Sequence, residues 1–251
     1  MTERILVTGM SGLIGGAVRE QLEGSYELTA LNRSSVPGVP TFQADIADFD
    51  SIRPAFENQQ TVVHLAASAR GNDPWERVRD PNLIGVYNVF EAARQAGAAR
   101  VIYASSGSTI SGWEQVQPYR ALVNGDYDSV NHPWPLITHE TPVRPAGVYG
   151  ATKVWGEAVA RHFTDSSELS IICLRIGLVN AVNRPTDSRQ FSVWCSQRDI
   201  SQMVERCIQA PAELRYDIFY AVSNNKWGYR DVSHARDVVG FEPQDEAEAY
   251  R

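Results

Sequence analysis

Residues 5–15 read ILVTGMSGLIG, an apolar stretch of strand length that runs directly into a glycine loop and then into a helical pattern. In such a loop Gly9 permits a tight turn, Gly12 lets the backbone approach a phosphate, and Gly15 lets the helix pack closely on the strand. The phosphates of a dinucleotide would then lie against the free N–H groups at the helix start. Because strand, loop and helix follow in this order, the stretch predicts a dinucleotide-binding loop rather than an ordinary turn.

The composition indicates an ordinary globular protein. The chain has 251 residues, of which 43% are hydrophobic and 21% are charged, enough for a substantial core. Its net charge of -7 argues against a nucleic-acid partner. No apolar run reaches the roughly 18 residues of a membrane span, and the first strand leaves no room for a signal peptide, so we expect a cytoplasmic protein without a membrane partner. Its cysteines, Cys173, Cys195 and Cys207, are widely spaced and read as buried thiols.

Strand-like apolar runs alternate with helical patterns over the first 177 residues. This alternation is typical of the α/β class, with a Rossmann-type doubly wound parallel sheet whose ligands bind at the carboxyl ends of the strands. After the first strand and helix, the expected strands cover residues 26–32, 39–45, 60–67, 99–106 and 169–177, and the expected helices lie near 48–57, 81–96 and 148–163.

Two stretches interrupt this alternation. Residues 107–147 have little periodicity, are rich in proline and aromatic residues, and follow the carboxyl end of a strand, where a substrate-side insertion is expected. From residue 178 the chain becomes polar and aromatic, with a clear helix only near 199–209, for which Asp199 is the expected N-cap. We therefore predict a dinucleotide-binding domain over 1–177 and a small substrate-binding lobe over 178–251.

The catalytic candidates are Tyr149 and Lys153. They lie four residues apart on a predicted helix, so both side chains project from one face. A cationic lysine, together with an oxidised nicotinamide, favours the phenolate and lowers the tyrosine pKa from about 10 toward neutrality, which makes the tyrosine a usable base. The same spacing occurs by chance on surface helices. Here the glycine loop upstream, and a strand that ends in Ser106 with a hydroxyl able to polarise a substrate oxygen, favour the catalytic interpretation.

These residues resemble the extended short-chain dehydrogenases/reductases, the NAD-dependent epimerase/dehydratase type, over nearly the whole chain. TGMSGLIG (8–15) is similar to the glycine loop of that family, HLAA (64–67) to its fourth-strand turn, and YGATK (149–153) to its catalytic segment. The resemblance implies that Asn82 supports the proton relay and that Asp45 and Ile46 contact the adenine. The catalytic set is then Ser106, Tyr149, Lys153 and Asn82. The predicted cofactor contacts are Gly9, Ser11, Gly12, Leu13, Ile14, Gly15, Asn32, Arg33, Ser34, Asp45, Ile46, Leu65, Ala66, Ala67, Tyr149, Lys153 and Ile176.

Within that family the tail, from RQFSVWCSQRDI (189–200) to residues 227–251, is most similar to uronate dehydrogenases. In those enzymes an arginine at the position of Arg189 grips the sugar carboxylate. The predicted substrate contacts are Ser68, Ser106, Ser108, Tyr149 and Arg189.

The chain also departs from the uronate dehydrogenases. Gly107 and Ser108 stand where those enzymes carry Asn and His, Leu178 stands where they carry a Ser, and the 107–147 loop is longer. Because Gly107 occupies the position where many relatives keep the catalytic Ser or Thr, Ser106 is the first choice for that hydroxyl and Ser108 is the alternative.

The end of the second strand bears on the choice of cofactor. Asn32 and Arg33 stand where a carboxylate would hold the ribose 2′-hydroxyl of NAD. Arg33 and Ser34 could bind a 2′-phosphate through charge-assisted hydrogen bonds, which favours NADP. The uronate dehydrogenases point instead to NAD, so both cofactors stay open.

No metal site is predicted, because the histidines at 64, 132, 139, 162 and 234 show no ligand spacing. Trp155 and Val159 follow Tyr149 on its helix and, as in relatives of this fold, suggest a homodimer. The leading hypothesis is an NAD(P)-dependent oxidoreductase that acts on a sugar or sugar acid. The alternatives are a nucleotide-sugar epimerase or dehydratase with a retained cofactor, and a non-catalytic dinucleotide-sensing protein.

Overall fold

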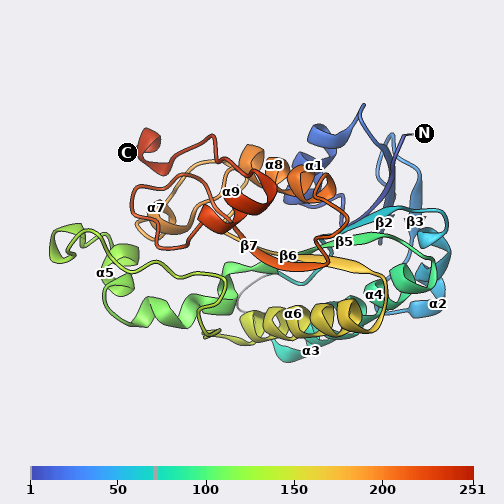
Figure 1. Cartoon of the computed structure of the whole chain (residues 1–251), viewed down its shortest axis with the longest axis horizontal. Coiled ribbons are helices and arrows are strands. Elements are labelled where there is room, and N and C mark those ends of the chain that lie inside the picture. Colours follow the sequence, from blue (N-terminus) through green and yellow to red (C-terminus); the bar gives the residue numbers. More distant parts are fainter. Residues whose placement is uncertain (1, 70–72) are drawn as a thin grey trace.

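A single parallel sheet of seven strands, in the order β3-β2-β1-β4-β5-β6-β7, forms the centre of the protein (Figure 1). The computed structural model describes residues 2–69 and 73–251. The inner strands β4, β5 and β6 are buried along almost their whole length, as expected for a sheet covered on both faces. The strands are β1 (Arg4–Thr8), β2 (Glu27–Asn32), β3 (Thr41–Gln43), β4 (Thr61–His64), β5 (Arg100–Ser106), β6 (Ser170–Ile176) and β7 (Tyr216–Ala221). The predicted Rossmann-type sheet is confirmed.

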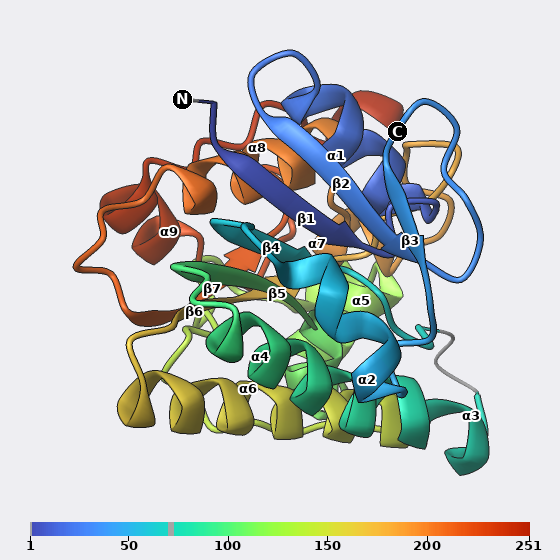
Figure 2. The same cartoon turned by 90° about the vertical axis from the view of Figure 1, so that its right-hand side faces the viewer.

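Helices cover both faces of this sheet (Figure 2). On one face α1 (Leu13–Leu22) lies beside α8 (Gln197–Ile208), and α9 (Ser233–Val239) completes the layer. On the other face lie α2 (Phe49–Ile52), α4 (Gly85–Gln95) and α6 (Val148–Ser166). Each layer packs on its own apolar cluster, centred on Val204 and Ile172 on the first face and on Phe90 and Tyr103 on the second. No helix in the described ranges is both long enough and apolar enough to cross a membrane.

The predicted domain boundary at residue 177 falls inside this one sheet. Residues 178–251, expected to form a separate small lobe, supply the edge strand β7 and the covering helix α8.

The N-cap of α8 differs from the predicted one. Ser196 is the N-cap, and its hydroxyl accepts a hydrogen bond from the backbone N–H of Asp199 at 2.9 Å. Asp199 lies inside that turn, where its carboxylate accepts a hydrogen bond from Ser223 at 2.6 Å.

The insertion after β5 is more ordered than its lack of periodicity suggests. A 3-10 helix covers Gly107–Gln115, and α5 covers Tyr119–Asn124. Both pack on a third apolar cluster that includes Leu122 and Tyr229. This cluster joins the insertion to the chain after β6. The two segments predicted to lie on the substrate side, 107–147 and the chain from 178, therefore pack together as one unit. The remaining α-helices are α3 (Trp75–Arg79) and α7 (Gln190–Val193).

The glycine loop between β1 and α1 has the close backbone contacts that its sequence predicts. Gly9 has a φ of 74°, and a Cβ there would lie 2.8 Å from the backbone nitrogen of Ala66 in the turn after β4. A Cβ on Gly15 would lie 2.5 Å from the carbonyl oxygen of Gly9. Since backbone atoms cannot move aside as a flexible side chain can, both positions require glycine.

The neighbouring glycines of α1 offer a matched test of this packing. Gly15→Ala should destabilise the protein by about 1 to 3 kcal/mol, because the added methyl overpacks against the Gly9 carbonyl. Gly16→Ala should stabilise it by about 0.5 to 1 kcal/mol, because a methyl at Gly16 meets nothing within 4 Å and alanine favours a helix. Denaturant unfolding of both variants measures the difference. Equal stabilities would show that the helix does not press on the loop.

Candidate active site

Three segments meet at the carboxyl edge of the sheet. The glycine loop follows β1, residues 65–67 follow β4, and Ser106 ends β5. Backbone hydrogen bonds hold the first two together, since the N–H of Leu65 donates to the carbonyl of Thr8 at 3.1 Å and that of Ala66 donates to the Thr8 hydroxyl at 3.1 Å. Ile176 pairs with Ser106 at the end of β6. The predicted cofactor and catalytic residues therefore share one edge, where parallel-sheet proteins bind ligands.

The start of α1 fits the pyrophosphate of a dinucleotide. Gly12 is its N-cap, and no side chain caps the first-turn N–H groups. Ser11 and Gly12 are exposed, and Leu13 is 41% exposed, so the approach to these groups is open. Uncapped N–H groups at the positive end of a helix favour a bound anion. The loop from Gly9 to Gly15 could therefore hold the phosphates.

The predicted ribose and adenine contacts surround the end of β2. The side-chain amide of Asn32 donates to the Ser11 hydroxyl at 2.6 Å, which ties the strand end to the glycine loop. Arg33 is exposed directly after Asn32 and forms no ion pair within the described ranges. Ser34 and Asp45 are also exposed, whereas Ile46 is buried against Gly85. An exposed cation with no internal carboxylate is free to meet an anionic ligand.

Lys153 is the most unusual charged group of this edge. Its side chain is 1% exposed, and its ammonium donates a hydrogen bond of 2.7 Å to the carbonyl of Ala104 in β5. The nitrogen lies 5.8 Å from the centre of the Tyr149 ring, on the same face of α6. Burial lowers the pKa of Lys153 to about 7, although the nearby Glu157 carboxylate opposes this shift. Lys153 can therefore gain or lose its charge near neutral pH.

Tyr149 and Ser106 face each other across the same edge. Burial raises the pKa of Tyr149 above its usual value, and a hydrogen bond with the Ser106 hydroxyl partly offsets that rise. Ser106 also caps the following 3-10 helix, because its oxygen accepts a hydrogen bond from the N–H of Ser108 at 3.0 Å. Ser108, the alternative hydroxyl, lines the adjoining cavity together with Tyr149. The geometry thus brings Ser106, Tyr149 and Lys153 together.

Asn82 lies behind this group rather than within it. It is fully buried in a π-helical turn, Asp80–Ile84, that precedes α4. Its side chain accepts from the N–H of Ser68 at 2.8 Å and donates to the Ser68 carbonyl at 2.9 Å and to the Thr152 hydroxyl at 3.2 Å. Asn82 therefore fixes the chain after β4 against α6, the helix that carries Tyr149.

A buried ion pair near Lys153, between Glu157 and Arg175, was not predicted from the sequence. Glu157 accepts hydrogen bonds from Ser105 at 2.6 Å and from Arg175 at 2.9 and 2.8 Å, and both charged side chains are at most 6% exposed. The sequence signal was the i,i+4 spacing of Lys153 and Glu157 on α6. Arg175, the partner of Glu157, lies on β6, and only the fold brings these two side chains together. The pair ties α6 to β5 and β6.

A cavity of about 440 Å³ opens beside Tyr149, lined by Ser108 and Arg189. Arg189 does not project freely into it, because its guanidinium grips Glu114 with two hydrogen bonds of 2.6 and 2.8 Å. The Tyr229 hydroxyl donates to the same carboxylate at 2.7 Å. Burial tends to raise the pKa of Glu114, but its arginine neighbours outweigh burial and the pKa is lowered.

A second arginine, Arg230, adds to the positive charge of this corner. Its side chain is 2% exposed, and one terminal nitrogen lies 4.0 Å from Glu114. Its Nε and its other terminal nitrogen are buried with no hydrogen-bond partner in the part of the chain that the structure describes. A Cβ on Gly107 would lie 2.4 Å from this guanidinium, so the glycine makes room for it. Two arginines and one carboxylate leave the corner with a net positive charge.

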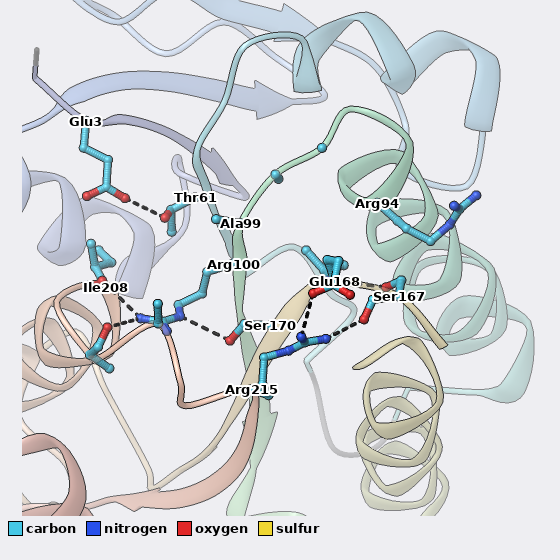
Figure 3. Close-up of a pocket in the computed structure, with 15 residues that line it drawn as sticks. Glu3, Thr61, Arg94, Ala99, Arg100, Ser167, Glu168, Ser170, Ile208 and Arg215 are labelled. Carbon is cyan, nitrogen blue, oxygen red and sulfur yellow. Dashed lines mark hydrogen bonds and ion pairs between the residues drawn. The ribbon is translucent and has the colours of Figure 1, made fainter. Parts of the chain in front are cut away.

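A larger cavity of about 600 Å³ lies at the opposite, amino edge of the sheet (Figure 3). Arg100, which begins β5, donates there to the carbonyls of Ala210 at 2.6 Å and Pro211 at 2.7 Å. Arg215 pairs with Glu168 at 3.0 Å. These arginines are thus bound to groups of the protein itself, and Arg100 holds the segment that follows α8. We therefore do not propose this cavity as a ligand site.

Comparison with known proteins agrees with this geometry. The family model described as "NAD dependent epimerase/dehydratase family" matches residues 5–241. The NAD-dependent glucose-6-phosphate dehydrogenase of Haloferax volcanii is 30% identical over 255 residues, which cover 98% of this chain and 94% of that protein. The uronate dehydrogenase of Agrobacterium fabrum is 31% identical over 254 residues, which cover 99% of this chain and 87% of that protein.

Among solved structures, a mutant of the uronate dehydrogenase from Agrobacterium tumefaciens complexed with NAD superposes with a TM-score of 0.84. Its sequence is 30% identical to this one, and the match covers 100% of this chain and 88% of that one.

The buried lysine predicts a specific dependence of stability on pH. Unfolded, Lys153 titrates near its ordinary value of about 10.4, whereas folded it titrates near 7. Between these values the unfolded state binds more protons, so stability rises with pH. Lys153→Met removes this dependence. Relative to wild type, the cofactor-free variant should be more stable near about pH 6 than near about pH 9, by a difference of about 2 to 3 kcal/mol.

Thermal or urea unfolding at both pH values measures this difference. Lys226→Met is the matched control, because Lys226 is exposed and its removal should leave the pH profile unchanged. A Lys153→Met profile parallel to that of the wild type would show that the ammonium is not buried in solution.

Proposed function

The chain belongs to the NAD dependent epimerase/dehydratase family, and we propose that it is an oxidoreductase that moves a hydride between a nicotinamide dinucleotide and a sugar or sugar acid. The observation that carries the proposal is the group formed by Ser106, Tyr149 and Lys153 beside an uncapped glycine loop. The similar proteins named as uronate and glucose-6-phosphate dehydrogenases support the substrate class.

Each residue of this group has a task that its surroundings suit. A bound nicotinamide would supply the hydride acceptor or donor. Tyr149 takes the proton from the substrate hydroxyl, and the neighbouring Ser106 hydroxyl orients the reacting oxygen. Lys153, when charged, favours the tyrosinate. Its hydrogen bond to the Ala104 carbonyl holds the ammonium in place beside Tyr149.

Tyr149→Phe tests this proposal directly. Without the phenolic oxygen no group at this position can accept the hydroxyl proton, so turnover should fall by about two to four orders of magnitude. Binding of the cofactor, followed by fluorescence titration, should change little. Tyr26→Phe, at a partly exposed tyrosine just before β2, is the matched control and should keep full activity. Turnover within a few-fold of wild type in Tyr149→Phe would remove this residue from the mechanism.

For the cofactor we propose a preference for NADP over NAD. The support is local: Asn32 is engaged with Ser11, no carboxylate ends β2, and Arg33 and Ser34 are exposed beside the glycine loop. A guanidinium and a hydroxyl at this place suit a 2′-phosphate. The NAD-bound uronate dehydrogenase structure is the argument for the other cofactor.

Arg33→Ala separates these two cofactors. If Arg33 binds the 2′-phosphate, the variant should lose about 1.5 to 3 kcal/mol of NADP affinity, the value of a hydrogen bond to a charged group, and almost none of its NAD affinity. Isothermal titration with each cofactor gives both numbers. Equal losses for NAD and NADP would contradict the assignment.

For the substrate we propose that Arg189 binds an anionic group, a carboxylate or a phosphate. Glu114 occupies the edge of the guanidinium that carries Nε, and this fixes the plane of the group at the cavity wall. The remaining terminal nitrogen is then available to a ligand. The buried charge of Arg230 behind Glu114 strengthens the attraction for an anion.

Arg189→Lys keeps the charge but loses the planar fork. We therefore expect a rise in KM of about tenfold or more for an anionic substrate, with little effect on a neutral sugar. Arg184→Lys, at an exposed position of the same loop, serves as the control. Unchanged kinetics in both Arg189→Lys and Arg189→Ala would exclude Arg189 as the anion contact.

We also propose that the enzyme works in the cytoplasm as a homodimer that pairs through α4 and α6. Ile84 and Tyr87 are each 48% exposed beside α6, and Trp155 and Val159 are only partly buried there. Apolar side chains left open on adjacent helices are typical of such an interface.

A further inference from the structure

Two histidines and an aspartate converge where the insertion meets the start of β7 and the first turn of α9. His139 belongs to the insertion, Asp217 to the start of β7, and His234 to the first turn of α9. One ligand atom from each residue lies within 4.8 Å of the other two. All three side chains are half-buried, so the group is neither sealed in the core nor freely solvated.

Within the described ranges, the contacts of this trio leave one buried ring nitrogen without a hydrogen-bond partner. The Nε2 of His234 lies 2.8 Å from a carboxylate oxygen of Asp217, and the same oxygen accepts the N–H of Ile218 at 2.7 Å. The two imidazole rings stack with their centres 3.8 Å apart. The Nδ1 of His139 is buried and has no hydrogen-bond partner within the described ranges. A buried polar atom without a partner costs free energy, which a ligand at this place would recover.

We propose that His139, Asp217 and His234 bind a divalent transition-metal ion, with Zn²⁺ the best fit. Imidazole nitrogens and a carboxylate oxygen are its common ligands, and two histidines with one carboxylate leave a position for water. A tetrahedral zinc site needs ligand atoms about 3.3 Å apart. The His234–Asp217 pair already lies close to that spacing. The stacked rings do not point their in-plane lone pairs at one common place, so binding requires the His139 ring to turn about its soft χ2 torsion and leave the stack.

The ion would cross-link three parts of the fold. The neighbours of His139 already contact the chain near β7: Ile137 pairs with Arg230, and the Thr138 carbonyl accepts the Tyr220 hydroxyl at 3.5 Å. A metal at His139 would clamp the insertion to β7 and α9. Because the insertion walls the cavity and leads into α6, the ion would stabilise that wall without touching the hydride chemistry. This proposal does not depend on the proposed function.

The test uses the full chain without a histidine tag, stripped with a chelator and then titrated with Zn²⁺ by calorimetry. We expect one ion per chain and a raised melting temperature when zinc is present. Co²⁺ should give visible absorption bands of a low-coordinate site. His139→Gln and His234→Gln should each weaken Zn²⁺ binding by about 100-fold or more, whereas His162→Gln, at an exposed histidine of α6, should bind as the wild type does.

Melting curves in chelator show whether the variants fold, since each folded variant should give a cooperative transition. A modestly lower melting temperature is expected there, because the ring stack is lost. Binding that persists unchanged in both His139→Gln and His234→Gln would place zinc elsewhere, for instance on a cysteine, and would overturn the proposal. Absence of stoichiometric binding to the wild type at millimolar Zn²⁺ would overturn it as well.

Discussion

The arrangement of this site depends on one buried carboxylate. Glu157 is bound by the Arg175 guanidinium at 2.9 and 2.8 Å and by the Ser105 hydroxyl at 2.6 Å, so that it joins α6 to the two strands beneath it. A buried ion pair contributes little net stability, because desolvation offsets most of its attraction. Its effect is on position. With α6 fixed over β5, the Lys153 ammonium binds the Ala104 carbonyl, and Tyr149, one turn earlier on the helix, lies beside Ser106. Loss of Glu157 would leave the charge of Arg175 unpaired in the core. It would also remove the contacts that fix the position of α6 over β5 and β6.

The same burial sets the electrostatics. Lys153 is shielded from solvent, and burial lowers its pKa to about 7, which places its protonation equilibrium near neutral pH. The pKa of Tyr149 is raised rather than lowered, because burial disfavours its charged form. The cofactor-free protein therefore holds a neutral phenol beside a lysine that is easily protonated. A positive charge delivered nearby would favour the tyrosinate, so the proposed base becomes active when the site is filled. At the substrate side the net positive corner of Arg189, Glu114 and Arg230 favours an anion.

How much could be predicted from the sequence follows from how far apart the interacting residues lie. The glycine loop and the Tyr149–Lys153 pair are local patterns. The sequence therefore predicted both the strand–loop–helix unit and the shared helix face of the two side chains. Two other groups come from segments that only the folded sheet brings together. They are the Glu114–Arg189 pair beside Tyr149 and the separate cluster of His139, Asp217 and His234. The strand β7 was missed because it is an edge strand whose first half is only partly buried, so its sequence does not form a continuous apolar run. The predicted Asp199 cap was wrong because Ser196 competes for the same turn and has the free hydroxyl.

The central claim is that this site transfers a hydride to or from a free sugar or sugar acid, and one measurement tests it most directly. The purified protein is mixed with NAD or NADP and, in turn, with aldoses, uronic acids and sugar phosphates, while the absorbance of the reduced nicotinamide is followed. The account predicts reduction with at least one member of the panel, in amounts equal to the sugar consumed. No reduction with any sugar, together with a nicotinamide cofactor that co-purifies and stays bound, would contradict it and indicate an epimerase or dehydratase instead.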